Sequence, residues 1–204
     1  MADENQIVLK REVDRVALSN QSRFVIKRKF WSFLERKFYV WTHDGQPILF
    51  VKHPLFRFRD EFNICSDETE THKIYKLKSR QVIAINFNYD LTDAQTGALL
   101  ATITKKGLKS LVRDTFLILD ENGAEIGQMR EHGAAILRRF FPWLTSRHEI
   151  TMHGQPAATI QQVFRFFNKE FNVEINQGTA DHRFVLGCAL LAVIAEARRE
   201  DSNY

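Results

Sequence analysis

Short runs of apolar and aromatic residues, separated by turn residues, make up most of this chain. Runs rich in Phe, Tyr, Val, Ile and Thr that are bounded by Gly, Asp and Asn are typical of antiparallel strands joined in hairpins. Gly45, Gly97, Gly123 and Gly154 stand between pairs of such runs, so the pattern predicts a meander of hairpins. The runs lie at 24–31, 36–42, 47–51, 56–60, 62–66, 71–78, 82–93, 98–104, 115–120, 124–129, 147–152, 156–163 and 170–175.

Two segments interrupt this pattern. Residues 1–17 are polar and charged, and we expect a flexible leader there. Residues 132–145 (HGAAILRRFFPWLT) form an insert that is either a short helix or an irregular loop, because Pro142 disfavours a long helix. No linker rich in Pro, Gly or Ser divides the rest, so we expect one domain over residues 18–204.

The segment from Phe184 to Ala195 (FVLGCALLAVIA) has helical character and no polar face. It is too short to cross a bilayer, which needs about 20 apolar residues. An apolar segment of this length is typical of a buried helix, and in this chain strands must cover it on all sides. Asp181 precedes it as the predicted N-cap. The helix residues that we expect to be buried are Phe184, Leu186, Leu190, Val193 and Ile194.

Composition places the chain among ordinary globular proteins, with 44% hydrophobic and 26% charged residues in a length of 204. Its two cysteines, Cys65 and Cys188, form no CxxC pair. The polar N-terminus is not a signal peptide. These features predict a cytoplasmic protein.

The sequence carries none of the short motifs that mark common catalytic or metal sites. It contains no GxSxG, Walker or GxGxxG motif, and its seven histidines show neither HxH nor HExxH spacing. The acidic turns at 67–70 and 120–125 lack the ligand spacing of a calcium loop. We therefore expect no enzyme activity, no metal and no cofactor.

Positive charge is gathered in two places, although the formal net charge is only +4. In 27–37, five basic residues face Glu35 alone, and 105–113 contain basic residues without any acid. One interpretation is that these side chains face water and discourage edge pairing of strands. The other is a patch for an anionic membrane, where each basic side chain contributes about 1 kcal/mol. Nucleic acid needs similar charge, but no recognition motif is present, so we expect none. The candidate lipid-binding residues are Lys27, Arg28, Lys29, Arg36, Lys37, Lys105, Lys106 and Lys109.

Two stretches carry a resemblance to a known superfamily. FVIKRKFWSFLERKFYVWTHDGQPILFV (24–51) is similar to the opening hairpins of the LURP-one-related proteins and the phospholipid scramblases. NKEFNVEI (168–175), followed by Asp181 and the apolar helix, resembles their shared ending. The resemblance runs over roughly residues 18–200. It implies the tubby C-terminal-like fold, a closed antiparallel β-barrel of about twelve strands around a central hydrophobic helix.

The resemblance also implies association with membranes, because tubby domains bind phosphoinositide headgroups through basic side chains. By that analogy, Lys27, Lys29, Lys105 and Lys106 are candidate contacts. We predict a non-enzymatic module at the inner face of the membrane that binds an anionic lipid or a membrane-linked protein. Phospholipid scrambling is the alternative, although residues 166–175 lack the acidic segment that scramblases place before their last helix. The remaining hypothesis is a structural or regulatory interaction protein without a lipid ligand.

Overall fold

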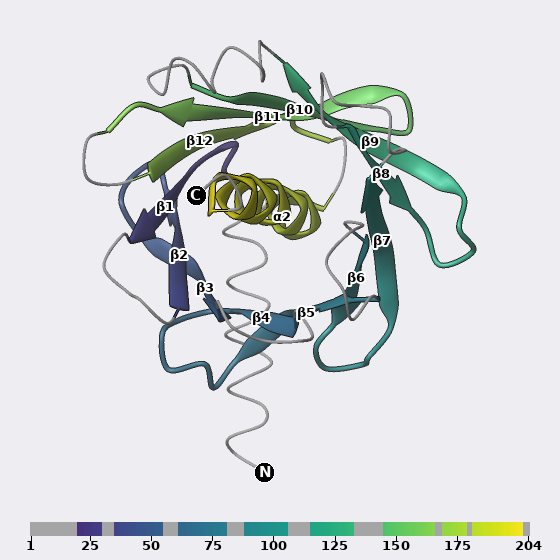
Figure 1. Cartoon of the computed structure of the whole chain (residues 1–204), viewed down its shortest axis with the longest axis horizontal. Coiled ribbons are helices and arrows are strands. Elements are labelled where there is room, and N and C mark those ends of the chain that lie inside the picture. The colour runs from purple at the N-terminus through teal and green to yellow at the C-terminus, as the bar shows by residue number, and fades with distance from the viewer. Residues whose placement is uncertain are drawn as a thin grey trace.

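Twelve antiparallel strands form a closed barrel around one helix in the described part of the chain (Figure 1). The structure is a computed structural model, and it describes residues 20–29, 35–54, 61–80, 88–105, 115–132, 145–165, 169–178 and 181–201. The elements are β1 (Arg23–Lys29), β2 (Glu35–Thr42), β3 (Pro47–Pro54), β4 (Glu61–Cys65), β5 (Lys73–Ser79), β6 (Asn88–Asp93), β7 (Leu99–Lys105), β8 (Thr115–Leu119), β9 (Glu125–His132), β10 (Arg147–Met152), β11 (Gln155–Val163), β12 (Lys169–Ile175) and α2 (His182–Asp201).

Each strand pairs with the strand that follows it in sequence, and β1 pairs with β12 to close the sheet. In that closing pair, Ile26 lies opposite Phe171 and Phe24 lies opposite Val173. Closure leaves no sheet edge, which removes the unpaired backbone groups that invite aggregation. The expected fold class, a closed antiparallel barrel with a C-terminal helix, is therefore confirmed.

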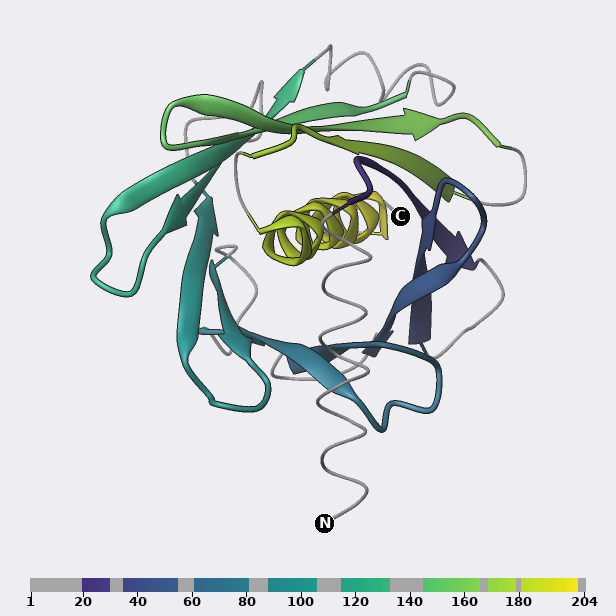
Figure 2. The same cartoon turned by 180° about the vertical axis from the view of Figure 1, so that it is seen from behind.

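The helix α2 occupies the interior of the barrel in both views along the barrel (Figures 1 and 2). Of the five residues expected to be buried, Leu186, Leu190, Val193 and Ile194 are at most 1% exposed, and Phe184 is partly buried against the core. Alternate residues of the strands point inward onto the helix, as period-two patterning requires. The absence of a polar face in the sequence thus reflects burial on every side.

Asp181 is the N-cap of α2, as expected from the sequence. Its carboxylate oxygen Oδ1 accepts a hydrogen bond of 2.8 Å from the backbone N–H of Arg183, and its carbonyl accepts one of 3.0 Å from Val185. No helix within the described ranges is long and apolar enough to span a membrane.

Tight turns connect the strands at one end of the barrel. At Thr42–Gln46, the Thr42 N–H donates to the Gln46 carbonyl at 2.9 Å, and Gly45 adopts a φ of +86° that other residues rarely tolerate. The pairing register shifts beside this turn, between Val40 and Trp41. The connections at the opposite end lie wholly or partly outside the described residues. So do the expected leader at 1–17 and positions 133–144 of the insert.

Candidate functional site

Three lysines stand side by side on the outer face of the barrel, one on each of β1, β2 and β3. The strand register places Lys29 opposite Lys37, and Lys37 opposite Lys52. Directly opposite side chains on one face have Cβ atoms about 4.5–5.5 Å apart, and like charges in such pairs are destabilising. We name Lys29, Lys37 and Lys52 the lysine row. Three ammonium groups in adjacent cross-strand positions repel one another unless nearby carboxylates offset the repulsion.

A single carboxylate bridges two members of the row. Glu35 Oε1 lies 3.5 Å from Lys37 Nζ, and Glu35 Oε2 lies 3.2 Å from Lys52 Nζ. The hydrogen bond with Glu35 raises the pKa of Lys52, and the charges of Glu35 and Glu70 add to this effect. All of these side chains are at least a quarter exposed, so the pairs contribute little to stability. Lys52 therefore stays protonated, and these side chains remain accessible to water.

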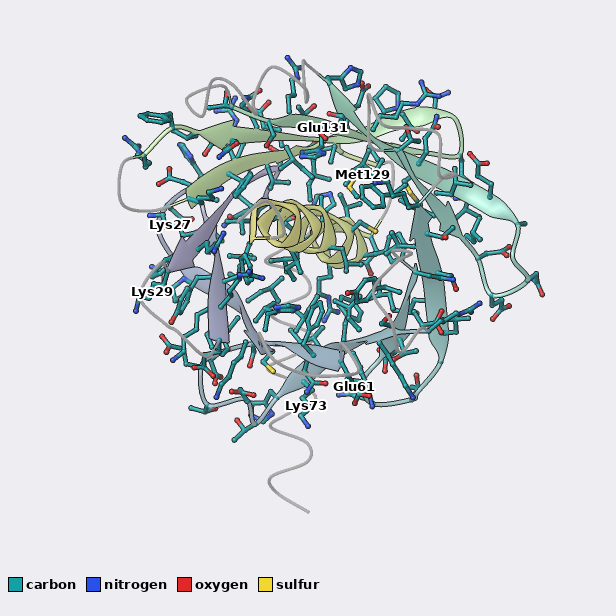
Figure 3. All side chains as sticks on the ribbon, viewed as in Figure 1. Lys27, Lys29, Glu61, Lys73, Met129 and Glu131 are labelled. Carbon is teal, nitrogen blue, oxygen red and sulfur yellow. The ribbon has the colours of Figure 1, made fainter. Side chains whose placement is uncertain are left out.

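Two outer lysines lie over aromatic rings. Lys27 Nζ is 5.7 Å from the centroid of Trp41, and Lys29 Nζ is 5.1 Å from that of Tyr39. Neither ammonium forms an ion pair with any residue that the structure describes. Lys27 lies opposite Glu170, whose carboxylate instead lies 3.8 Å from Arg165. Cation–π contacts position a charge without neutralising it, so this face presents positive charge to the solvent. In Figure 3, Lys27 and Lys29 project from the outer side of β1.

Tyr39 and Phe50 also belong to the outer face, but they are buried. They are 7% and 2% exposed, and their ring centroids lie 5.2 Å apart. Burial raises the pKa of Tyr39 to about 12, and the nearby Glu68 carboxylate adds to the increase. Glu68 belongs to the connection between β4 and β5, so this connection reaches the outer side of β2.

That connection, Ser66–His72, is here named the acidic turn. The Ser66 N–H donates to the His72 carbonyl at 3.0 Å, and the Thr69 N–H donates to Asp67 Oδ1 at 2.9 Å. Glu70 has a φ of +57°, in the left-handed region that non-glycine residues seldom adopt. Its carboxylate oxygen Oε1 lies 3.6 Å from Lys52 Nζ. The acidic turn thus brings a second carboxylate to the edge of the lysine row.

The other sequence candidates do not join this face. Arg28 and Arg36 alternate with the outward lysines and share the inward parity of the core residues on β1 and β2, and Arg36 is only 5% exposed. Lys105 is exposed at the end of β7, which lies across the barrel from β1 (Figure 1). Lys106 and Lys109 lie outside the described residues. The two basic clusters of the sequence therefore do not form one surface in the part of the chain that is described.

Inward-facing polar residues line the inside of the barrel near the ends of several strands. Arg36 lies opposite His53, and Glu131 lies opposite His148, and all four are at most 5% exposed. His53 packs edge-on against Phe62, with ring centroids 5.0 Å apart. These side chains are buried inside the barrel, so they are not part of the candidate face.

Two outer cations elsewhere on the barrel are closely paired with carboxylates. Arg80 Nε donates to Asp90 Oδ1 at 2.8 Å, and Thr102 donates to the same oxygen at 2.8 Å. On β4 and β5, Lys76 Nζ lies 2.7 Å from Glu61 Oε1. By contrast, the three-strand lysine row shares Glu35 and Glu70. Among the residues that the structure describes, the lysine row therefore has fewer carboxylates than lysines, whereas Arg80 and Lys76 each have a carboxylate of their own.

Sequence reasoning missed Lys52 because it lies outside both basic clusters. The signal was available in the hairpin turn at Asp44-Gly45, which folds β3 back along β2. Counting outward from that turn would have placed Lys52 beside Lys37.

No protein-family model matches the sequence, and no significantly similar curated protein was found. Within the described ranges, no group of three or more His, Cys, Asp or Glu side chains is placed to hold a metal ion.

Proposed function

We propose that this chain is a non-enzymatic binding module that docks its lysine-row face onto the anionic headgroups of a membrane. The observation that carries the proposal is the cross-strand row Lys29, Lys37 and Lys52. Like charges placed directly opposite one another destabilise a sheet. An anionic surface would attract each of the three lysines and so offset the repulsion between them.

The charge balance of the face sets the expected strength of binding. Four outer lysines (Lys27 and the lysine row) face the carboxylates of Glu35 and Glu70, which leaves two net positive charges. At about 1 kcal/mol for each basic side chain near an anionic membrane, the face supplies about 2 kcal/mol. Attraction of this size is reversible, and it weakens as salt shortens the Debye length.

Trp41 adds an aromatic ring to the lysines of this face. It is half-buried on the outer side of β2, beneath the ammonium of Lys27. Indole rings favour the headgroup level of a bilayer because they are apolar with one polar N–H group. Trp41 therefore supplies apolar ring surface beside the lysines, while its indole N–H is buried in the protein.

The resemblance to the LURP-one-related proteins supports the same proposal, since the observed barrel agrees with the fold that it implies. Cytoplasmic placement at the inner leaflet, where anionic lipids are concentrated, is part of the proposal. Phospholipid scrambling and a membrane-linked protein partner remain untested predictions, and no contact described above favours either.

Vesicle flotation tests the proposal. The protein is mixed with vesicles of phosphatidylcholine alone, or of phosphatidylcholine with phosphatidylserine or a phosphatidylinositol bisphosphate, at low and high salt. We expect flotation only with the anionic vesicles, and less of it at high salt. Free inositol phosphate that displaces the protein would show that headgroup chemistry is sufficient. Equal recovery with neutral and anionic vesicles would overturn the proposal.

A further inference from the structure

We propose that the acidic turn restrains the lysine row, because Glu70 competes with an anionic headgroup for Lys52. This inference rests on the proposed function and adds an internal regulator to it. Its consequence is that the module binds membranes below its full strength until the Glu70 carboxylate is displaced or neutralised.

The contacts around Lys52 carry the first part of the argument. Its ammonium lies between two carboxylates, with Glu35 Oε2 at 3.2 Å and Glu70 Oε1 at 3.6 Å. Glu35 is fixed on β2 and also contacts Lys37. Glu70 belongs to a turn and reaches Lys52 from outside the β2–β3 pair. A ligand can replace Glu70 beside Lys52 without disturbing the sheet, because Glu70 lies on a turn whereas Glu35 lies on a strand.

The backbone of the acidic turn carries the second part. A φ of +57° is a conformation for which glycine or asparagine is the usual residue. The chain instead places glutamate at position 70, and in this conformation its carboxylate lies 3.6 Å from Lys52 Nζ. Backbone strain of this kind persists only when its surroundings over-determine it. Here Asp67 does so, because its carbonyl accepts the Glu70 N–H at 3.3 Å and its carboxylate accepts the Thr69 N–H at 2.9 Å.

Glu68 reaches the same face from the same turn. Its charge acts on the hydroxyl of Tyr39, whose ring lies under the ammonium of Lys29. Two carboxylates of this turn therefore act on Lys52 and on Tyr39, the residue whose ring lies beneath Lys29. An anionic headgroup that approaches Lys29 and Lys52 is therefore repelled by this negative charge.

Charge-neutral variants test the competition. Glu70→Gln removes the charge and keeps the size of the side chain, and we expect about fivefold tighter binding to vesicles of phosphatidylcholine and phosphatidylserine. Glu121→Gln is the matched control, because it makes the same change of net charge in the exposed turn between β8 and β9. The gain from Glu70→Gln should disappear in a Lys52→Gln background. Glu70→Gly, which also relieves the strain of the positive φ, should bind as tightly as Glu70→Gln. That result would show that the tighter binding does not come from a folding defect.

The outcomes separate the two proposals. Tighter binding by Glu70→Gln alone, dependent on Lys52, supports the inference. Anion-dependent binding by the wild type that is the same in Glu70→Gln and Glu121→Gln overturns the inference and leaves the proposed function standing. No anion-dependent binding by the wild type or by Glu70→Gln overturns the proposed function, and the inference with it.

Discussion

Replacing Gly187 with alanine should stabilise the protein, although this glycine lies in the middle of the buried helix. A Cβ added at this position would lie 3.6 Å from Leu91 Cδ2 and 3.8 Å from Ile64 Cδ1. Both distances are ordinary van der Waals contacts, so the space between α2 and the wall of the barrel accepts a methyl group. The substitution therefore removes the helix penalty of glycine without creating a clash.

The size of the gain follows from two terms. Alanine is favoured over glycine in a helix interior by about 1 kcal/mol. Burial of the added methyl group contributes up to about 0.8 kcal/mol more. For a chain of this size, each kcal/mol raises Tm by about 2–4 °C. We therefore expect Gly187→Ala to increase the free energy of unfolding by about 1–2 kcal/mol.

Gly127 on β9 is a control for which the same substitution should have the opposite effect. A Cβ there would lie 2.5 Å from the carbonyl oxygen of Thr151 and 2.6 Å from Met152 Sδ. The carbonyl belongs to the adjacent strand β10 and cannot move without disturbing the ladder. Overpacking of this kind costs about 1–3 kcal/mol, so Gly127→Ala should be destabilising.

Urea unfolding of the two variants and the wild type measures both effects, because the free energy is read from the midpoint at constant slope. Opposite signs are expected for the two glycines. A loss of stability in Gly187→Ala comparable to that in Gly127→Ala would refute the reasoning, because it would mean that α2 does not sit against Leu91 and Ile64 as described.

Two further predictions concern titratable groups. Burial raises the pKa of the Cys188 thiol to about 12 and that of Cys65 to about 11; native protein should therefore react with a thiol reagent only at the rate at which it unfolds, and rapid labelling without denaturant would contradict the buried helix. The Thr69 hydroxyl, which donates to Asp67, lowers the pKa of that carboxyl below 3.8, although partial burial opposes the shift. The stability that Asp67 contributes should be complete above pH 3.8 and lost as pH falls through its folded pKa. The difference in free energy of unfolding between the wild type and Asp67→Asn should become smaller as pH falls below 3.8. An NMR titration that gives Asp67 an ordinary pKa would exclude this contribution to stability.

Much of the fold could be predicted because local patterns agree with the tertiary structure. The turns at Gly45 and Gly123 mark hairpins that the structure contains, and the strands on either side match their predicted runs within a few residues. The N-cap at Asp181 could be read directly, since capping depends on neighbouring residues alone. Burial of the helix followed from its lack of a polar face. Closure of the barrel depends on pairing between distant strands, and it was predicted only from the family resemblance.

The site could be predicted only in part, because it depends on cross-strand register. Lys29 and Lys37 were found as a local charge cluster, but the alternation of Lys27, Arg28 and Lys29 did not reveal which side chains face outward. The register adds Lys52 and directs Arg36 to the interior. Glu70 contacts Lys52 from a left-handed backbone conformation, for which glutamate gives no sequence signal.

The most direct test of the account is to remove the lysine row and measure binding to anionic vesicles. The variant Lys29→Gln, Lys37→Gln, Lys52→Gln is compared with Lys73→Gln, Lys76→Gln, Lys78→Gln on β5, which makes the same change of net charge elsewhere on the barrel. Three charges at about 1 kcal/mol each predict a loss of about a hundredfold in affinity for the first variant and a much smaller loss for the second. Equal losses in the two variants, or full retention of binding by the first, would contradict the assignment of the lysine row as the membrane-binding face.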